Sequence, residues 1–481
     1  NVGGYAPKTD EDAINRFIGE FFRVLTIRER AFGARNVATL DDYFADRETN
    51  PSEGDPYGHM FLVFDGFSSY LADHEGARES FLRLLDNGGR FGLHVVVTAL
   101  SNSEIPMKMH KHFGTSVHMA VQDVNESFVM GSTKVLVQRL PAEQPGRCVD
   151  FTRQLEARVV VPQFEAIEPI DEADGMAVYD YRANYSAGIA KFVQAMQQRF
   201  PDPEQRAVPI QPAPPVIDYQ IIWDLYDGYA KRVAEATPPQ PGRRVAMDKH
   251  LPLAISTEDL RVVTVPDHTS PHLLAVGATQ SGKTTMLRNL INSIVQQFSA
   301  EEAQIVIVES RMALLAEQQK LAEAGYLMAY ADRNNLTGAV EKIKAAIEPR
   351  FPKLDGEQGL SAQAMQNRSW YSGPEVFVLI DGALTFTGSG FGMNSPLDPL
   401  LELMTRNDLG LHVYATGPAN GFSSTRQANK LYKALAEAQT TTLLLSGPAD
   451  EGTVWPGSGI KFALRRPGQA ALVDPENMKP E

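Results

Sequence analysis

The feature that most constrains this chain is a glycine-rich segment between an apolar run and a helical pattern. Residues 277–284 read Gly-Ala-Thr-Gln-Ser-Gly-Lys-Thr and match G-x-x-x-x-G-K-[ST] in full. The four residues before the segment, Leu-Leu-Ala-Val, predict a short buried strand, and apolar residues recur at helical spacing from Met286 to Phe298. Strand, loop and helix in this order are the context in which the pattern forms a phosphate-binding P-loop.

The residue types of this loop suit a phosphate group. Glycines let main-chain N–H groups approach phosphate oxygens, and the start of a helix favours negative charge. We expect Lys283 to contact the β- and γ-phosphates and the hydroxyl of Thr284 to bind Mg²⁺. The predicted ATP site consists of Gly277, Ala278, Thr279, Gln280, Ser281, Gly282, Lys283, Thr284 and Thr285.

A second apolar run, at residues 377–380, ends in Asp381. An acid in this position typically holds Mg²⁺ in P-loop ATPases, although a strand-end aspartate can also cap a turn. We predict Asp381 as the second magnesium ligand and, with Lys283, as the catalytic pair. Hydrolysing motors usually follow this aspartate with a glutamate that positions water, whereas this chain has Gly382. The sequence therefore predicts ATP and Mg²⁺ as cofactors, with slow hydrolysis.

Four other residues are weaker candidates for the same site. Glu309 follows the apolar run 305–308 and could replace the missing glutamate, but a carboxylate that only ends a strand is the simpler interpretation. Thr416 could sense the γ-phosphate or have its hydroxyl satisfied in a loop. Arg311 and Arg426 are candidates for an arginine that reaches the nucleotide of a neighbouring subunit, although surface arginines are common.

A proline-rich segment at residues 206–215 predicts a linker between two domains, residues 1–205 and 216–481. Landmarks recur between the two halves in the same order, which favours a duplicated module: Asp65-Gly66 and Asp381-Gly382, His94 and His412, Pro145-Gly146 and Pro467-Gly468. Residues 1–64 contain no G-x-x-x-x-G-K. We expect the first module to be truncated or to have lost its phosphate loop, and the absence of a strand before its first helix favours truncation.

Short apolar runs alternate with helical patterns, for example at residues 11–32 and 337–350. This alternation predicts an α/β fold with mostly parallel sheets flanked by helices. No apolar run is long enough to cross a bilayer, and the net charge of −14 argues against a general nucleic-acid-binding surface. The chain is therefore expected to be soluble.

The chain resembles the EccC family, the FtsK/SpoIIIE-type ATPases of type VII (ESX) secretion. The resemblance rests on stretches at residues 55–58, 123–126, 271–285, 368–373, 409–412 and 466–470, and it extends over nearly the whole chain. It implies tandem P-loop NTPase modules of the RecA/FtsK type, in which residues 1–205 are the later part of the second of three ATPase modules. It also implies that residues 216–481 are the complete third module.

The resemblance further implies partners and a location. Expected partners are small helical proteins of the WXG100 (Esx) type, recognised through their C-terminal signal, and other subunits of the ESX membrane core. A homo-hexamer at the cytoplasmic side of the plasma membrane is expected, with no nucleic-acid partner. In the family the later modules mainly bind nucleotide, which agrees with Gly66 and Gly382. Two alternatives stay open: an FtsK-class DNA translocase and a non-catalytic substrate-binding scaffold.

Overall fold

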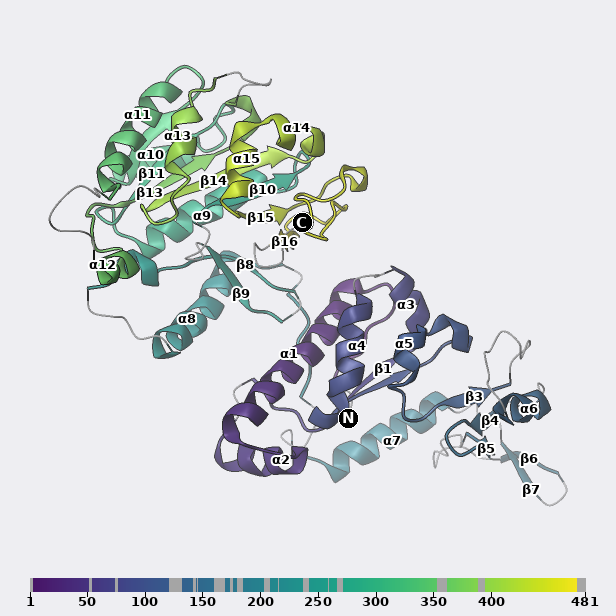
Figure 1. Cartoon of the computed structure of the whole chain (residues 1–481). Helices are drawn as coiled ribbons and strands as arrows, with labels where there is room; N and C mark the ends of the chain where they lie inside the picture. The colour runs from purple at the N-terminus through teal and green to yellow at the C-terminus, as the bar shows by residue number, and fades with distance from the viewer. Residues whose placement is uncertain are drawn as a thin grey trace. The chain divides into compact units, whose positions relative to one another are not determined.

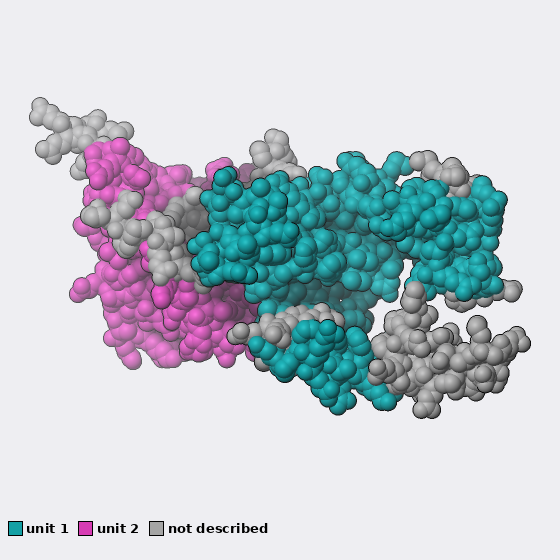
Figure 2. Space-filling model, turned by 90° about the horizontal axis from the view of Figure 1, so that it is seen from below, with its two compact units in different colours: residues 1–213, 257–259 teal, residues 214–256, 260–481 magenta. Residues whose placement is uncertain are grey.

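The chain forms two compact units, which Figure 2 distinguishes by colour. Unit 1 comprises residues 1–213 and 257–259, and unit 2 comprises residues 214–256 and 260–481. Pro145 of the Pro-Gly landmark, residues 123–126, and residues 206–207 and 215 of the proline-rich segment lie outside the described residues. The computed structural model describes residues 3–51, 54–73, 77–120, 132–141, 144, 146–159, 169–173, 176–179, 185–202, 208–214, 216–236, 242–257, 259–265, 271–352, 361–387 and 394–473.

Unit 2 is built on a seven-stranded sheet in the order β12-β11-β13-β14-β10-β15-β16. All neighbouring strands are parallel except β15 and β16. Every residue of β10 and β13 is buried, as expected for strands in a sheet that is covered on both faces. The strands are β10 (Leu273–Gly277), β11 (Ala303–Val308), β12 (Leu327–Ala331), β13 (Glu375–Ile380), β14 (Leu411–Pro418), β15 (Thr441–Leu444) and β16 (Ala471–Val473).

Helices cover both faces of this sheet, so the predicted α/β class with a mostly parallel sheet is confirmed (Figure 1). One face packs against α11 (Leu336–Ile347), α13 (Asp398–Leu403) and α15 (Lys430–Glu437). The other face packs against α9 (Lys283–Gln297), α10 (Leu315–Glu323) and the β8–β9 hairpin (Leu251–Ile255 and Val262–Val265). Side chains alternate along β13: Val378 and Ile380 join the first cluster, and Phe377 and Leu379 join the second. The remaining helices of unit 2 are α8 (Tyr219–Ala236), α12 (Ala362–Asn367) and α14 (Phe422–Ala428).

Unit 1 contains a smaller parallel pair of strands, β1 (Met60–Phe64) and β2 (Leu93–Val97). Its long helix α1 (Glu11–Arg35) extends past the predicted residues 11–32 and ends where Asn36 adopts a left-handed conformation. The core lies between one face of the strand pair and α1, α3 (Phe67–Asp73) and α4 (Ala77–Asn87). The other elements are α2 (Leu40–Thr49), α5 (Met107–His110), β3 (Val117–Met119), α6 (Ser132–Arg139), β4 (Arg147–Asp150), β5 (Leu155–Arg158), β6 (Pro169–Ala173), β7 (Met176–Tyr179) and α7 (Tyr185–Arg199).

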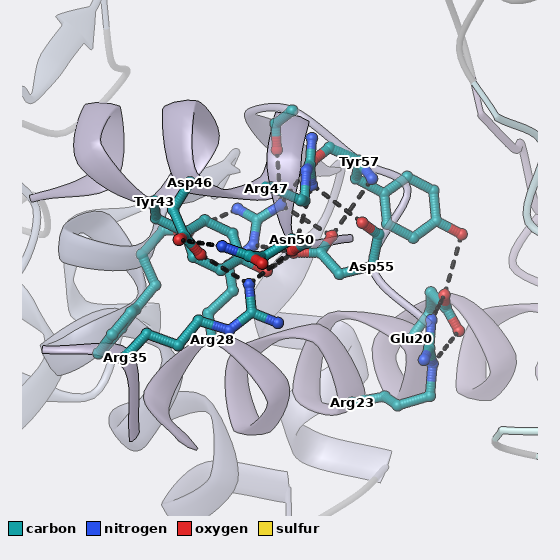
Figure 3. Close-up of polar contacts among 12 residues, drawn as sticks. Glu20, Arg23, Arg28, Arg35, Tyr43, Asp46, Arg47, Asn50, Asp55 and Tyr57 are labelled. Atoms are coloured by element: carbon teal, nitrogen blue, oxygen red, sulfur yellow. Dashed lines mark hydrogen bonds and ion pairs between the residues drawn. The ribbon is translucent and has the colours of Figure 1, made fainter. Parts of the chain in front are cut away.

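A buried ion pair fixes the loops that precede β1 and β2 (Figure 3). Arg28 of α1 and Asp55 are both inaccessible to solvent, and Arg28 Nε donates to Asp55 Oδ2 over 2.7 Å. The hydroxyl of Tyr43 donates to the same carboxylate over 2.8 Å. Arg28 also donates to the carbonyls of Gly58 and Phe91. The pair therefore ties α1 and α2 to the start of both strands, and its remaining hydrogen-bonding capacity is satisfied, as burial of charge requires.

Among the described residues, no helix combines the length and the apolar composition that a membrane span requires.

Candidate nucleotide-binding site

The glycine-rich loop joins the end of β10 to the start of α9, at the C-terminal edge of the sheet. Gly277 is the last residue of β10, and Lys283 is the first residue of α9. A Cβ atom at Gly277 would lie 2.3 Å from Ser281 Oγ and 2.7 Å from Leu445 Cβ, so only glycine fits there. Gly282 takes a φ of 104°, which strongly favours glycine. Close neighbouring side chains thus require glycine at position 277, and the backbone conformation favours it at position 282.

Lys283 lies inside the curve of this loop. Its Nζ donates to the carbonyl oxygens of Gly277 over 2.7 Å and of Ala278 over 2.6 Å. Burial lowers the pKa of this ammonium, the charge of Asp381 raises it, and the charge of Arg311 lowers it further. A partly desolvated cation that is held by neutral carbonyls would gain from an anionic partner.

Ser281 provides a second indication that the loop suits a phosphate group. Its Oγ is buried and has no hydrogen-bond partner in the described part of the chain. A buried hydroxyl without a partner costs free energy, which a phosphate oxygen would recover. The amide of Ala278 is already used, because it donates to the carbonyl of Ser446 over 2.7 Å. The other residues predicted to bind nucleotide, Thr279, Gln280 and Thr285, are exposed on the loop and on the first turn of α9.

The second feature of the site is a cluster of oxygen atoms around Asp381. Thr284 Oγ1 donates to Asp381 Oδ2 over 2.8 Å, although the two residues are 97 positions apart in the chain. On its other side the carboxylate accepts a hydrogen bond of 2.8 Å from Thr416 Oγ1. Thr416 Oγ1 in turn accepts the amide proton of Gly382 over 2.8 Å. A hydroxyl beside a carboxylate is a donor set that Mg²⁺ accepts, so the predicted metal ligands lie where one ion could contact both.

Thr416 is fully buried, and Asp381 and Gly382 occupy its hydroxyl. Of the two interpretations left open by the sequence, this geometry favours a satisfied hydroxyl over a γ-phosphate sensor. Its role of holding the Asp381 carboxylate was not predicted. Nothing in the sequence near Thr416 indicates this contact, because it depends on the pairing of β13 with β14.

Glu309 is not positioned to replace the missing glutamate. It is 1% exposed, and its carboxylate accepts the amide protons of Ala313 over 2.7 Å and of Leu314 over 2.9 Å. The hydroxyl of Tyr330 donates to it over 3.0 Å. With these three bonds the carboxylate fixes the loop after β11 instead of facing a water molecule, which agrees with the simpler interpretation of the sequence.

The geometry also does not support Arg426 as an arginine that reaches a neighbouring subunit. Its guanidinium donates to the carbonyl oxygens of Thr453, over 2.9 Å, and Val454, both within unit 2. Burial lowers its pKa. Arg426 therefore holds the loop before residue 455 to α14.

Unit 1 repeats the strand-end arrangement of unit 2. The register of β1 with β2 places Phe61 beside His94, and that of β13 with β14 places Phe377 beside His412. The two pairs of rings are stacked with centroids 4.7 Å and 4.5 Å apart. The recurrence of His94 and His412 in the sequence is thus also a recurrence of register and of ring contacts.

The hydrogen bonds at the strand ends recur as well. Thr98 Oγ1 donates to Asp65 over 2.5 Å and accepts the amide proton of Gly66 over 3.0 Å, as Thr416 does in unit 2. Gly66 and Gly382 have φ angles of 76° and 77°. The two units differ on the sheet face that carries these phenylalanines. Phe61 is 63% exposed in unit 1, whereas Phe377 is fully buried in unit 2, in the cluster that contains α9. Unit 1 therefore has the strand-end aspartate, Asp65, and the threonine that holds it. Its described residues include no loop comparable to residues 277–284.

Comparison with known proteins places this site in a family context. The sequence model of the FtsK/SpoIIIE family matches residues 247–421, which include both Lys283 and Asp381. The ESX-1 secretion system protein EccCb1 of Mycolicibacterium smegmatis (strain mc(2)155) is 28% identical over 485 aligned residues, covering 99% of this chain and 74% of that protein. The ESX secretion system protein EccC of Thermomonospora curvata is 26% identical over 94% of this chain, which corresponds to 31% of the relative.

Two solved structures are similar over almost the whole chain. The cytoplasmic domain of the T. curvata type VII secretion ATPase EccC has a TM-score of 0.69 at 25% identity, and this chain covers 49% of it. A structure of ATPases 2 and 3 of T. curvata EccC, in complex with a signal sequence peptide, has a TM-score of 0.72 at 24% identity. This chain covers 77% of that structure, and 99% of this chain is matched. The fold is thus that of tandem ATPase modules.

Proposed function

Because the chain carries an FtsK/SpoIIIE domain and is related over its whole length to the EccC ATPases of ESX secretion systems, we propose that unit 2 binds ATP with Mg²⁺ as part of a type VII secretion motor. The observation that carries this proposal is the 2.8 Å contact between Thr284 and Asp381 beside Lys283. Bound Mg²⁺ would supply positive charge next to the phosphates. The family match itself implies use of a nucleotide.

Each residue of the proposed site has a defined task. Main-chain amides from Thr279 to Lys283 would cradle the phosphates, and the Lys283 ammonium would exchange its two carbonyl partners for phosphate oxygens. Thr284 and Asp381 would hold the metal ion, with Thr416 keeping the carboxylate in place.

We expect tight binding of ATP but slow hydrolysis. Gly382 has no side chain to orient water, and the carboxylate of Glu309 is committed to its own loop. Turnover by the 481-residue chain should therefore stay below about 1 s⁻¹, the lower end of typical enzyme rates. Faster steady-state release of phosphate would contradict this part of the proposal.

Substitution of Lys283 by alanine tests the nucleotide site directly. The variant should lose binding of ATP and ADP in isothermal titration calorimetry with Mg²⁺, because the loop would keep its shape but lose its main cation. Lys320, an exposed residue of α10, provides the matched control, and Lys320→Ala should bind like the unaltered chain. Unchanged nucleotide affinity in Lys283→Ala would refute the site.

We further assign unit 1 to the second ATPase module of this family and unit 2 to the third, with assembly as a homo-hexamer at the cytoplasmic side of the membrane. The similarity of fold to ATPases 2 and 3 of T. curvata EccC supports the assignment of the modules. Partners would be other ESX subunits and exported WXG100-type proteins. The signal peptide bound in the T. curvata complex supports recognition of such a segment.

A fluorescent peptide with the C-terminal sequence of a WXG100-type protein would test this recognition by anisotropy against the 481-residue chain. Saturable binding that unlabelled peptide competes away is expected, and a scrambled peptide is the control. A mobility-shift assay with duplex DNA tests the alternative of a DNA translocase. Binding of DNA without binding of any signal peptide would favour that alternative.

A further inference from the structure

The loop after β11 brings Arg311 to the sheet edge that carries the proposed nucleotide site. Strands β11 and β13 are parallel neighbours with Val308 paired to Ile380. The amide of Asp381 donates to the carbonyl of Val308 over 2.8 Å. Because parallel strands end at one edge, the residues directly after Val308 and Ile380 lie side by side. Arg311 thus follows β11 at the edge where Asp381 follows β13.

The backbone of this loop is held from two sides. Glu309 accepts the amide proton of Ala313, as described above. Arg288 of α9, the helix that begins with Lys283, donates to the carbonyl of Ala313 over 2.5 Å. Both bonds anchor Ala313, and the preceding residue, Met312, takes a φ of 54°, which is uncommon for a residue other than glycine. The loop is therefore fixed to the helix of the P-loop and presents Arg311 from a defined position.

Arg311 is exposed, and its guanidinium has no hydrogen-bond or ion-pair partner within the part of unit 2 that the structure describes. It lies close enough to Lys283 for its charge to contribute to the lowered pKa of that ammonium, after the larger effects of burial and of Asp381. Lys283 and Arg311 thus lie near the Asp381 carboxylate at this edge, where the Glu309 carboxylate is bound to amides of its own loop. The two cations together suit an anion that carries more than one negative charge.

We propose that Arg311 contacts the terminal phosphate of the nucleotide bound to its own unit, and so distinguishes a triphosphate from a diphosphate. This inference rests on the proposed binding of ATP by unit 2. It replaces the expectation that Arg311 reaches into a neighbouring subunit. The planar guanidinium can donate two parallel hydrogen bonds to one phosphate, which an ammonium cannot do. Glu309 and Arg288 act as positioning residues, because they fix the loop that carries Arg311.

The test compares affinities for ATPγS and ADP, with Mg²⁺, in the 481-residue chain. Arg311→Ala should weaken binding of ATPγS by about tenfold or more and binding of ADP by less than about threefold, as expected from loss of a charge-assisted contact to the γ-phosphate. The affinity of Arg311→Lys for ATPγS should lie between that of the unaltered chain and that of Arg311→Ala. Arg333→Ala is the matched control, because Arg333 is an exposed arginine that follows β12 in the same sheet and donates to the carbonyl of Thr385. It should leave the ratio of the two affinities unchanged.

Equal weakening of ATPγS and ADP in Arg311→Ala, or no change in either affinity, would overturn the inference. Absence of nucleotide binding by the unaltered chain would refute the proposed function, and the inference with it. A mixture of Lys283→Ala and Arg311→Ala chains separates action within one chain from action between chains. If an arginine from another chain completed the site, the mixture would regain tight binding of ATPγS at the intact P-loop, whereas action within one chain predicts no recovery.

Discussion

Thr416 Oγ1 donates a hydrogen bond of 2.8 Å to Asp381, and so connects the end of β13 to β14. The same hydroxyl accepts the amide proton of Gly382, so one buried side chain fixes both the proposed metal ligand and the residue after it. In unit 1 the hydroxyl of Thr98 makes the corresponding bond to Asp65. The position of the acid thus depends on a threonine of the neighbouring strand.

Substitution of Thr416 by valine should lower the free energy of unfolding by about 1–2 kcal/mol, because the amide of Gly382 would lose its buried acceptor. It should also weaken binding of Mg²⁺-ATP more than binding of ATP in EDTA, since the Asp381 carboxylate would lose its orientation. Urea denaturation and calorimetry measure the two effects. Thr416→Ser keeps the hydroxyl and should largely restore both quantities. An equal loss of affinity with and without Mg²⁺ would contradict the proposed role.

Replacement of Gly382 by glutamate would introduce the residue type that hydrolysing motors carry, but we expect it to destabilise unit 2. Gly382 has a φ of 77°, and a residue with a Cβ atom pays about 1–2 kcal/mol for a left-handed conformation. Gly382→Asn should cost less, because asparagine tolerates this conformation better. Thermal unfolding and phosphate release are the measurements. A stable glutamate variant with rapid turnover would show that the side chain alone limits hydrolysis.

The buried pair of Arg28 and Asp55 should make a large contribution to the stability of unit 1 (Figure 3). Asp55→Ala would leave the inaccessible guanidinium of Arg28 without its counter-charge, and such a loss typically costs about 3–5 kcal/mol. The midpoint of the unfolding transition of unit 1 should therefore shift to a lower urea concentration. Arg83→Ala, which breaks a solvent-exposed ion pair with Glu29, is the control and should change the midpoint little. Similar midpoints for the two variants would contradict this prediction.

His272 predicts a dependence of stability on pH in unit 2. Complete burial, with a smaller effect of the charge of His412, lowers the pKa of this imidazole from 6.5 to about 3. Between these two values the unfolded state binds a proton that the folded state does not, so stability falls as the pH decreases. The slope from this one group is up to about 1.4 kcal/mol per pH unit.

Urea unfolding at several pH values between 7 and 4.5 measures this slope. His272 Nδ1 accepts the amide proton of Val413 over 3.1 Å, and the side-chain oxygen of glutamine can accept in its place. In His272→Gln the free energy of unfolding should therefore depend less steeply on pH, by an amount that corresponds to about one proton. An unchanged slope in the variant would assign the pH dependence to other groups.

The sequence alone determined the local chemistry of this protein. The spacing of Gly277, Gly282 and Lys283 predicts a phosphate loop, because a turn and a helix start depend mainly on adjacent residues. Alternating apolar runs and helical patterns predicted the α/β class for a similar reason, since their periods match strands and helices directly. The ends of individual helices, such as that of α1, were less well predicted, because capping is decided by one or two residues.

Tertiary structure decided which distant side chains act together. Asp381 meets Thr284 and Thr416 only because β14 lies between β10 and β13, and no spacing in the sequence encodes this strand order. The same packing binds the carboxylate of Glu309 to its own loop and leaves Arg311 exposed near Lys283. Contacts between residues far apart in the chain depend on how the whole sheet is assembled, and local sequence patterns do not specify that assembly.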